Sequence, residues 1–273
     1  MTKAQAVLLI LCLLVSVGFS WTQVDGILKL INTLFGATIV PDSKYMSRKL
    51  WRQKMSTIKF HYYCHICFSY LGIRPSNNLP EEKSYEPRTL IAKGHFFLTF
   101  DIKRQLHSMF SALAEPLCHT LKRTFSDASG IYTDIFDGRL YQSIRRQMEM
   151  AWSDVTVTLN TDGSPVFKSS KSSVWPIQVI LNELPIHLRF RNVIVGGLWF
   201  AKMHPPAHLF MRTFVEEFAK IGSIIWRHAG DHIISRVFAV FCSVDSPARA
   251  VLLNMKQFNG YFGCSCVWRR GHS

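Results

Sequence analysis

The order of apolar segments after residue 151 restricts the fold more than any other feature of the chain. Four segments are rich in β-branched and aromatic residues and predict strands: 155–159, 174–181, 193–200 and 237–244. Residues 209–221 carry apolar side chains at helical spacing and predict a helix between the third and fourth strands. Asp245-Ser-Pro-Ala predicts a helix start after the fourth strand. Three strands, a helix, a strand and a helix predict a mixed α/β sheet.

The preceding residues predict two further regions. Residues 1–38 are apolar and helix-like, with Gly36 as the expected stop, and 39–150 form a mostly helical region. Within the latter, 95–100 predicts a short strand, whereas 102–125 and 139–150 predict helices. The expected divisions are therefore 1–38, 39–150 and 151–273.

Residues 1–20 allow two interpretations. A lysine, a short apolar run and then small residues are typical of a secretory signal peptide, and the run is short for a membrane-spanning helix. The alternative is a buried helix that continues into the following residues. The first interpretation predicts a small basic protein, secreted or membrane-associated and without enzymatic activity.

The composition is that of a globular protein with a strongly basic balance. The 273 residues are 48% hydrophobic, which excludes a wholly disordered chain. The formal net charge of +14 favours polyanions, either nucleic acid or an anionic membrane surface. The alternative is an ordinary solvated basic surface, because the charge is spread along the chain without a long basic tail.

Two aspartates follow predicted strands. Asp162-Gly163 separates two β-like segments and is a good signal for a tight turn. Asp245 follows the most apolar strand, where it would cap the next helix. The alternative is that both carboxylates hold divalent cations, because Mg²⁺ and Mn²⁺ prefer oxygen ligands and two-metal nucleotidyl transfer needs carboxylates close together.

Four of the seven cysteines lie in two close pairs. Cys64 and Cys67 are separated by two residues, the spacing of half a zinc site. Cys264 and Cys266 are separated by one residue, with His272 downstream as a further candidate Zn²⁺ ligand. The remaining cysteines are expected to be small core residues: Cys12, Cys118 and Cys242.

An ordered set of short motifs resembles the transposase family of CACTA (En/Spm-type) DNA elements, in particular the animal copies. The resemblance extends from about Ile27 to the end of the chain. The motifs that carry it are LINTLFG (30–36), FHYYCHIC (60–67), IFDGRLY (135–141), LNTDGSPVFKSS (159–170), SVWPI (173–177), NELP (182–185), GLWF (197–200), FVEEF (214–218), VDSPARA (244–250) and FNGYFGCSC (258–266).

This resemblance implies an RNase H-like core with a DDE-type set of metal-binding acids. Asp162 matches the first acid of the family and Asp245 the second. The family cuts and joins DNA, so the resemblance implies DNA as the partner, Mg²⁺ or Mn²⁺ as the cofactor and the nucleus as the location. It implies no small-molecule substrate.

The chain departs from the family pattern in its ligands. No Asp or Glu follows Asp245, and Glu183, Glu216 and Glu217 have the wrong topological order to supply the third acid. Loss of one member of a catalytic set commonly reduces the rate by orders of magnitude, so we expect a catalytically inactive fragment.

The zinc ligands are also incomplete. Residues 78–88, where the family has its second cysteine pair, contain no cysteine. Three histidines are candidate replacements for the missing ligands: His61, His65 and His95. The alternative is that they are ordinary polar residues. The expected fold is thus a partial RNase H-like mixed sheet after a mostly helical region with a degenerate zinc-ribbon-like segment. Aromatic residues at 258–268 are expected to leave apolar surface uncovered and to favour self-association.

Overall fold

The computed structural model describes residues 21–34, 36–38, 40, 58–74, 86–122, 133–165, 173–201, 205–253 and 255–256. The chain divides into two compact units, Met1–Thr57 and Ile58–Ser273. In the first unit, α2 (Trp21–Leu34) confirms the predicted helix. Asn32 fixes the chain beyond α2, because its side chain donates to the Val40 carbonyl and accepts from the Val40 N–H.

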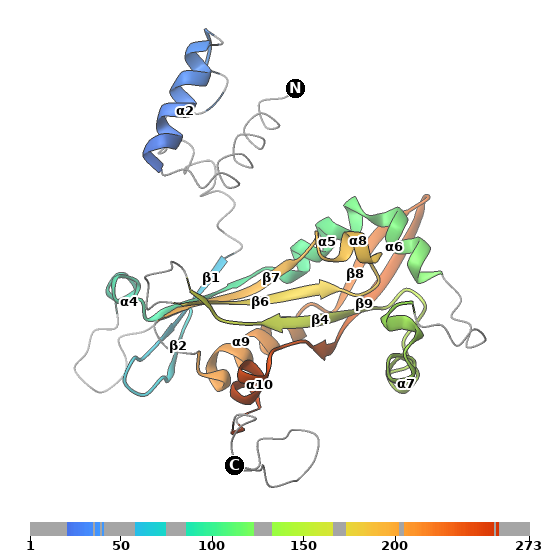
Figure 1. The fold of residues 1–273 in the computed structure, drawn as a ribbon. Helices are drawn as coiled ribbons and strands as arrows, with labels where there is room; N and C mark the ends of the chain where they lie inside the picture. Colours follow the sequence, from blue (N-terminus) through green and yellow to red (C-terminus); the bar gives the residue numbers. More distant parts are fainter. Residues whose placement is uncertain are drawn as a thin grey trace. The chain divides into compact units, whose positions relative to one another are not determined.

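The second unit is built on one mixed sheet (Figure 1). Its strands follow the order β2-β1-β3-β7-β6-β4-β9-β8, and the short β5 pairs with β6. The strand bounds are β1 (Ile58–Tyr63), β2 (Tyr70–Gly72), β3 (Phe96–Phe100), β4 (Val155–Thr161), β5 (Ser164–Pro165), β6 (Ser173–Leu181), β7 (Ile194–Ala201), β8 (Ser223–His228) and β9 (Asp231–Cys242). The α/β fold class is therefore confirmed.

Helices connect and cover these strands. Their bounds are α4 (Pro87–Lys93), α5 (Ile102–Ala112), α6 (Ala114–Leu121), the 3₁₀ turn η3 (Ile135–Asp137), α7 (Arg139–Gln147), α8 (Ile186–Arg189), α9 (Ala207–Ala219) and α10 (Ser246–Leu252). No helix within these described ranges is both long and apolar enough to cross a membrane.

Two glycines of β7 allow α9 to pack closely on the sheet. A Cβ atom on Gly196 would lie 2.5 Å from the Phe214 ring, and one on Gly197 would lie 3.2 Å from the Phe210 ring. Both phenylalanines come from α9 and are fully buried. The predicted helix over 209–221 is thus confirmed, and its aromatic face forms part of the core together with Trp199 of β7.

The predicted helix over 102–125 is broken into α5 and α6. The break falls at Leu113, between the two helices. Pro116 explains it, because proline lacks the N–H that would bond to the carbonyl of Ala112 in a continuous helix. Residues 123–125 lie outside the described residues.

The hairpin of β8 and β9 was missed by sequence reasoning, which placed one strand between α9 and α10. Its turn consists of Ala229 and Gly230, with φ values of 50° and 93°. This is a two-residue turn with positive φ at both positions, for which Asn-Gly is the usual signal. Ala-Gly is a weaker signal, and β9 begins at Asp231, earlier than its apolar part.

The expected division at residue 150 does not separate two compact units. β3 pairs antiparallel with β7, with Leu98 opposite Leu198, so the two expected regions share one sheet. The pairing joins segments about a hundred residues apart, and local composition contains no signal for such a contact. The boundary that the structure does contain lies between Thr57 and Ile58.

Candidate carboxylate site at the β4–β9 edge

Asp162 and Asp245 lie at the same edge of the sheet. β4 and β9 are neighbours and run parallel, with Leu159 opposite Cys242. Asp162 lies three residues after Leu159, and Asp245 lies three residues after Cys242. Because neighbouring strands are about 4.8 Å apart, matching positions on parallel strands remain close. The structure therefore brings the two acids to one edge, as the sequence order predicted.

Hydrogen bonds continue this pairing towards the two acids. The Ser243 N–H donates to the Leu159 carbonyl at 2.7 Å. The Asn160 side-chain amide donates to the Ser243 carbonyl at 2.6 Å. The backbones that lead to Asp162 and Asp245 are thus held side by side after the last paired residues.

Asp162 is exposed and lies between β4 and β5, which pair with β6 in one continuous register. A Cβ atom on the next residue, Gly163, would lie 2.4 Å from the indole of Trp175 on β6. Gly163 therefore packs against the Trp175 indole, and a side chain at this position would force a shift. The turn interpretation of Asp162 is wrong, because the chain continues along β6 through Asp162 and Gly163 and does not reverse there.

Asp245 is exposed and begins α10. Its Oδ1 accepts a hydrogen bond from the Ala248 N–H at 2.8 Å, which confirms its predicted role as a helix cap. A carboxylate has two oxygens with several lone pairs, so a cap at one oxygen leaves the other able to bind a cation. Capping and cation binding are therefore compatible at this residue.

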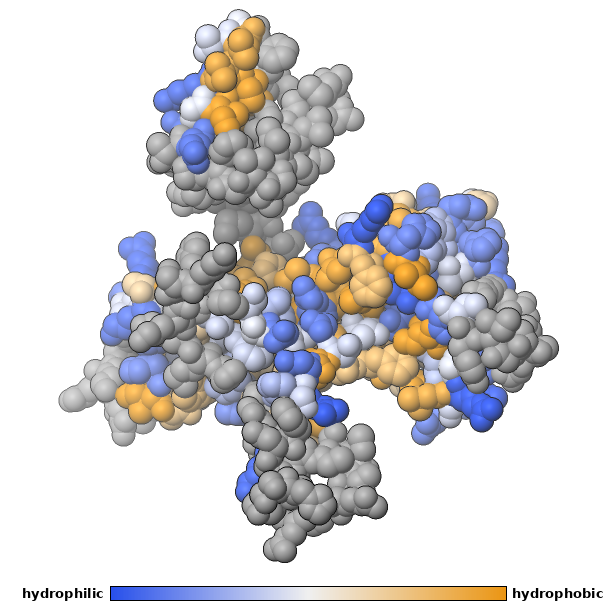
Figure 2. Space-filling view, in the orientation of Figure 1, coloured by the Kyte–Doolittle hydropathy of each residue, from blue (hydrophilic) through white to orange (hydrophobic). Residues whose placement is uncertain are grey.

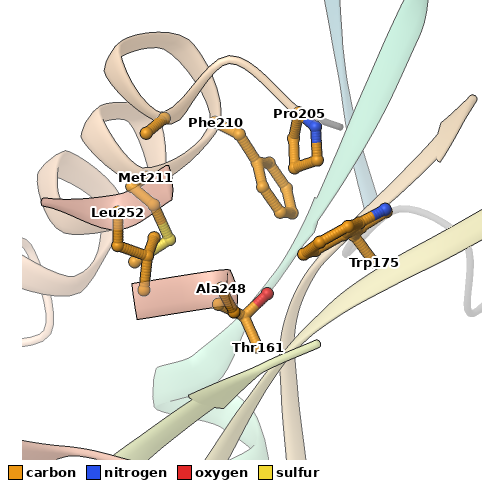
Figure 3. A pocket seen from close by; sticks show the side chains of 8 residues that line it. Thr161, Trp175, Pro205, Phe210, Met211, Ala248 and Leu252 are labelled. Atoms are coloured by element: carbon orange, nitrogen blue, oxygen red, sulfur yellow. The ribbon is translucent and has the colours of Figure 1, made fainter. Parts of the chain in front are cut away.

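The floor beneath this edge is apolar (Figure 3). Thr161, which precedes Asp162, and Ala248 of α10 line a small pocket with residues of β6 and α9. The Thr161 hydroxyl is buried and has no hydrogen-bond partner among the described residues. A wider cleft of about 900 Å³ adjoins it, lined by Leu159, Cys242 and residues of α9 and α10. Thr161 and Ala248 thus pack on apolar side chains of β6 and α9.

The described residues do not bring a third acid to these two. They contain no set of three or more His, Cys, Asp or Glu side chains placed to hold a metal ion. Glu183 follows β6, which runs antiparallel to β4, and bonds to Thr156 near the opposite end of β4. Glu183 therefore lies towards the other end of β4 from Asp162. Glu217 pairs with Lys59 and Lys220 instead.

Glu183 forms a buried polar centre that sequence reasoning did not predict. Its carboxylate accepts from the Tyr141 hydroxyl at 2.7 Å. It also accepts from the N–H and the hydroxyl of Thr156, both at 2.8 Å. Burial raises the pKa of Glu183, while the hydrogen bonds from Tyr141 and Thr156 act against that rise. The centre ties α7, β4 and the end of β6 together.

A second buried acid joins β4 to β9 directly. Asp154 accepts from the Arg236 backbone N–H at 2.9 Å and from its guanidinium at 2.6 Å. Burial favours the neutral form, but these bonds prevail and lower the pKa of Asp154. Because Arg236 lies on β9, this contact fixes β9 beside β4 at the end remote from Asp162.

The first cysteine pair lies where β1 ends. Cys64 is buried and Cys67 is exposed, and the Cys67 thiol contacts the Ser69 hydroxyl at 3.0 Å. Neither cysteine belongs to a metal-ligand cluster of the described residues. The second candidate zinc ligands, Cys264, Cys266 and His272, lie outside the described residues, as do 1–20 and the aromatic residues at 258–268.

The candidate replacement ligands have other partners. The two ring nitrogens of His61 lie 2.7 Å from the Tyr70 and Thr99 hydroxyls. Burial lowers the pKa of His61 to about 4. His65 and His95 stack with ring centroids 4.5 Å apart. His61 is thus a core histidine with both nitrogens in use, which agrees with its interpretation as an ordinary polar residue.

Replacement of Gly163 by alanine tests the packing under Asp162. The new methyl group would overlap the Trp175 indole, and such overpacking typically lowers the free energy of unfolding by about 1–3 kcal/mol. The matched control is Gly26→Ala in α2, where nothing lies within 4 Å of the added Cβ. Urea denaturation of both variants measures the difference, and an unchanged midpoint for Gly163→Ala would show that Gly163 does not pack tightly on Trp175.

The chain matches no known family model and no curated protein in comparisons of its sequence.

Proposed function

We propose that this chain is a transposon-derived, DDE-type transposase-like protein that has lost catalysis and retains affinity for DNA. The observation that carries this proposal is the placement of Asp162 and Asp245 after neighbouring parallel strands in matching register. A pair of carboxylates at one sheet edge is the arrangement that metal-dependent nucleotidyl transfer requires.

The topology supports an RNase H-like core for the residues from β4 onwards. If β5 is counted as the continuation of β4 and β8 is left out, the first strand lies between the second, β6, and the fourth, β9. β4 pairs antiparallel with β6 and parallel with β9. In RNase H-like nucleotidyl transferases one acid follows the first strand and another the fourth, and Asp162 and Asp245 have that order. The β8 strand, which precedes β9 as a hairpin partner, is an addition to this scheme.

The donor set fits a single hard cation and does not fit two. Two aspartates supply carboxylate oxygens, the ligands that Mg²⁺ and Mn²⁺ prefer. A bound ion of this kind would polarise a phosphoryl oxygen. Two-ion chemistry needs further oxygen ligands, and residues 246–273 contain no Asp or Glu. We therefore propose that this polypeptide neither cleaves nor joins DNA strands.

DNA affinity rests on the net charge of +14 rather than on a shaped groove. On the face in Figure 2, hydrophilic and hydrophobic residues are interspersed over the sheet unit. Such a surface contacts phosphates and reads no bases, so binding should be independent of DNA sequence.

Filter binding over a salt series tests the DNA role. If about four phosphates are contacted, affinity should fall roughly tenfold between about 50 and about 100 mM salt, because bound counterions are released. Two duplexes of unrelated sequence should give equal slopes. A flat salt response, or no retention at low salt, would remove DNA binding from the proposal while leaving the cation site to be tested separately.

A further inference from the structure

The β8 strand forms an edge of the sheet. In the part of the chain that the structure describes, β8 pairs with β9 and with no other strand. The pairing starts at the turn, where His228 lies opposite Asp231, and continues to Ser223 opposite Arg236. A six-residue edge of this kind is long enough to template pairing with another chain.

The hairpin geometry defines which backbone groups of β8 point outwards. In a two-residue hairpin the residues that flank the turn are hydrogen-bonded to each other, and bonded and non-bonded pairs then alternate. His228, Trp226 and Ile224 therefore bond to β9. The N–H and C=O groups of the alternate residues point away from β9, towards the open edge: Ser223, Ile225 and Arg227.

The side chains of β8 alternate between the core and solvent. Ile224 and Trp226 are buried, and the Trp226 ring packs edge-on against Phe110 of α5. Ile225 is 56% exposed, and its cross-strand neighbour Ile234 is 58% exposed. Two exposed isoleucines directly opposite each other form an apolar stripe that ends at the open edge.

We propose that β8 pairs antiparallel with β8 of a second copy of this chain, centred on Ile225. In this register Ile225 lies opposite its own counterpart, and the outward N–H and C=O groups of the two strands meet. Arg227 then lies opposite Ser223 of the second copy, so no like charges face each other. The isoleucine stripe continues from one hairpin into the next. A second copy is the occupant because this register matches the outward hydrogen-bonding groups and the exposed isoleucines of β8 with those of an identical strand.

This pairing is independent of the cation site and of DNA. A six-residue strand and four isoleucines form an interface smaller than the roughly 1,600 Å² of a standard stable complex. Association should therefore be weak and depend on protein concentration. The two-fold symmetry closes the pair, because each copy uses its β8 edge once.

Sedimentation equilibrium and hydrogen exchange on the full chain without DNA test the proposal. We expect a monomer–dimer equilibrium, with protection of the Ser223, Ile225 and Arg227 amides that increases with protein concentration. Ile225→Lys should raise the dissociation constant at least tenfold and abolish the concentration-dependent protection. Ile234→Lys should weaken the pair less, because Ile234 lies one strand further from the edge.

The matched control is Val215→Lys on α9, because Val215 is also 56% exposed. This variant should leave the dissociation constant and the concentration-dependent amide protection unchanged. A chain that stays monomeric at the highest soluble concentration would overturn the proposal. Dimerisation of equal strength in Ile225→Lys, or protection elsewhere than in β8, would overturn it as well.

Discussion

Replacement of Glu183 by alanine is expected to lower the free energy of unfolding by about 3–5 kcal/mol. The change removes the acceptor of three hydrogen bonds from Tyr141 and Thr156 in a fully buried site. Each donor left without a partner incurs its own desolvation penalty, and the shortened side chain also leaves a cavity. Chemical denaturation measures this loss, and the slope of the unfolding free energy against denaturant concentration should be unchanged.

Two further variants separate the hydrogen-bonding role of Glu183 from its charge. Glu183→Gln retains the shape and one acceptor, so it should destabilise less than alanine. Glu216→Ala removes an exposed glutamate of α9 whose partner is Arg212 at 2.9 Å, and such a pair contributes less than about 0.5 kcal/mol. Equal losses for Glu183→Ala and Glu216→Ala would show that the buried centre does not hold β4 and β6 together.

The second large effect is a loss of stability in acid that depends on His61. Burial lowers the pKa of His61 from 6.5 to about 4, with Lys59 and Lys220 acting in the same direction and Glu217 against it. Between pH 6.5 and about 4, His61 is protonated in the unfolded chain but remains neutral in the folded chain. Stability should therefore fall as the pH decreases from about 6.5 towards 4, by about 3 kcal/mol from this residue.

His61→Phe isolates that contribution. The substituted ring can retain the stacking on Phe97, whose centroid lies 4.9 Å from that of His61. It leaves the Thr99 hydroxyl without its partner, so the variant should be less stable at pH 7. Its stability should then decrease less steeply below pH 6.5 than that of the wild type. Parallel profiles for the two proteins would exclude His61 as the source of the acid sensitivity.

The sequence predicted those elements whose signals are local. Apolar segments and β-branched residues located β4, β6, β7 and the apolar part of β9, and helical spacing located α9. The order of the elements predicted that Asp162 and Asp245 lie at the same end of the sheet, because acids that follow neighbouring parallel strands meet there. The Asp245 cap was predictable from its local signal, whereas the tight turn expected at Asp162-Gly163 was wrong, because β5 continues β4 along β6.

The remaining features depend on contacts that distant segments make. Glu183 and Asp154 looked like ordinary acids in the sequence, and only the fold places Tyr141 and Arg236 against them. β8 was missed because Ala229-Gly230 lacks the usual turn signal. The pairing of β3 with β7 across the expected boundary had no local signature.

The central claim is that Asp162 and Asp245 form one cation site, and Mn²⁺ binding followed by electron paramagnetic resonance tests it most directly. Asparagine substitutions suit both positions, because asparagine has nearly the shape of aspartate and caps helices as well as aspartate does. Asp231→Asn, at the exposed hairpin end of β9, is the matched control. We predict one weak Mn²⁺ site that Asp162→Asn and Asp245→Asn each abolish and Asp231→Asn leaves intact. Equal Mn²⁺ binding in all four proteins, or none in the wild type, would contradict the claim.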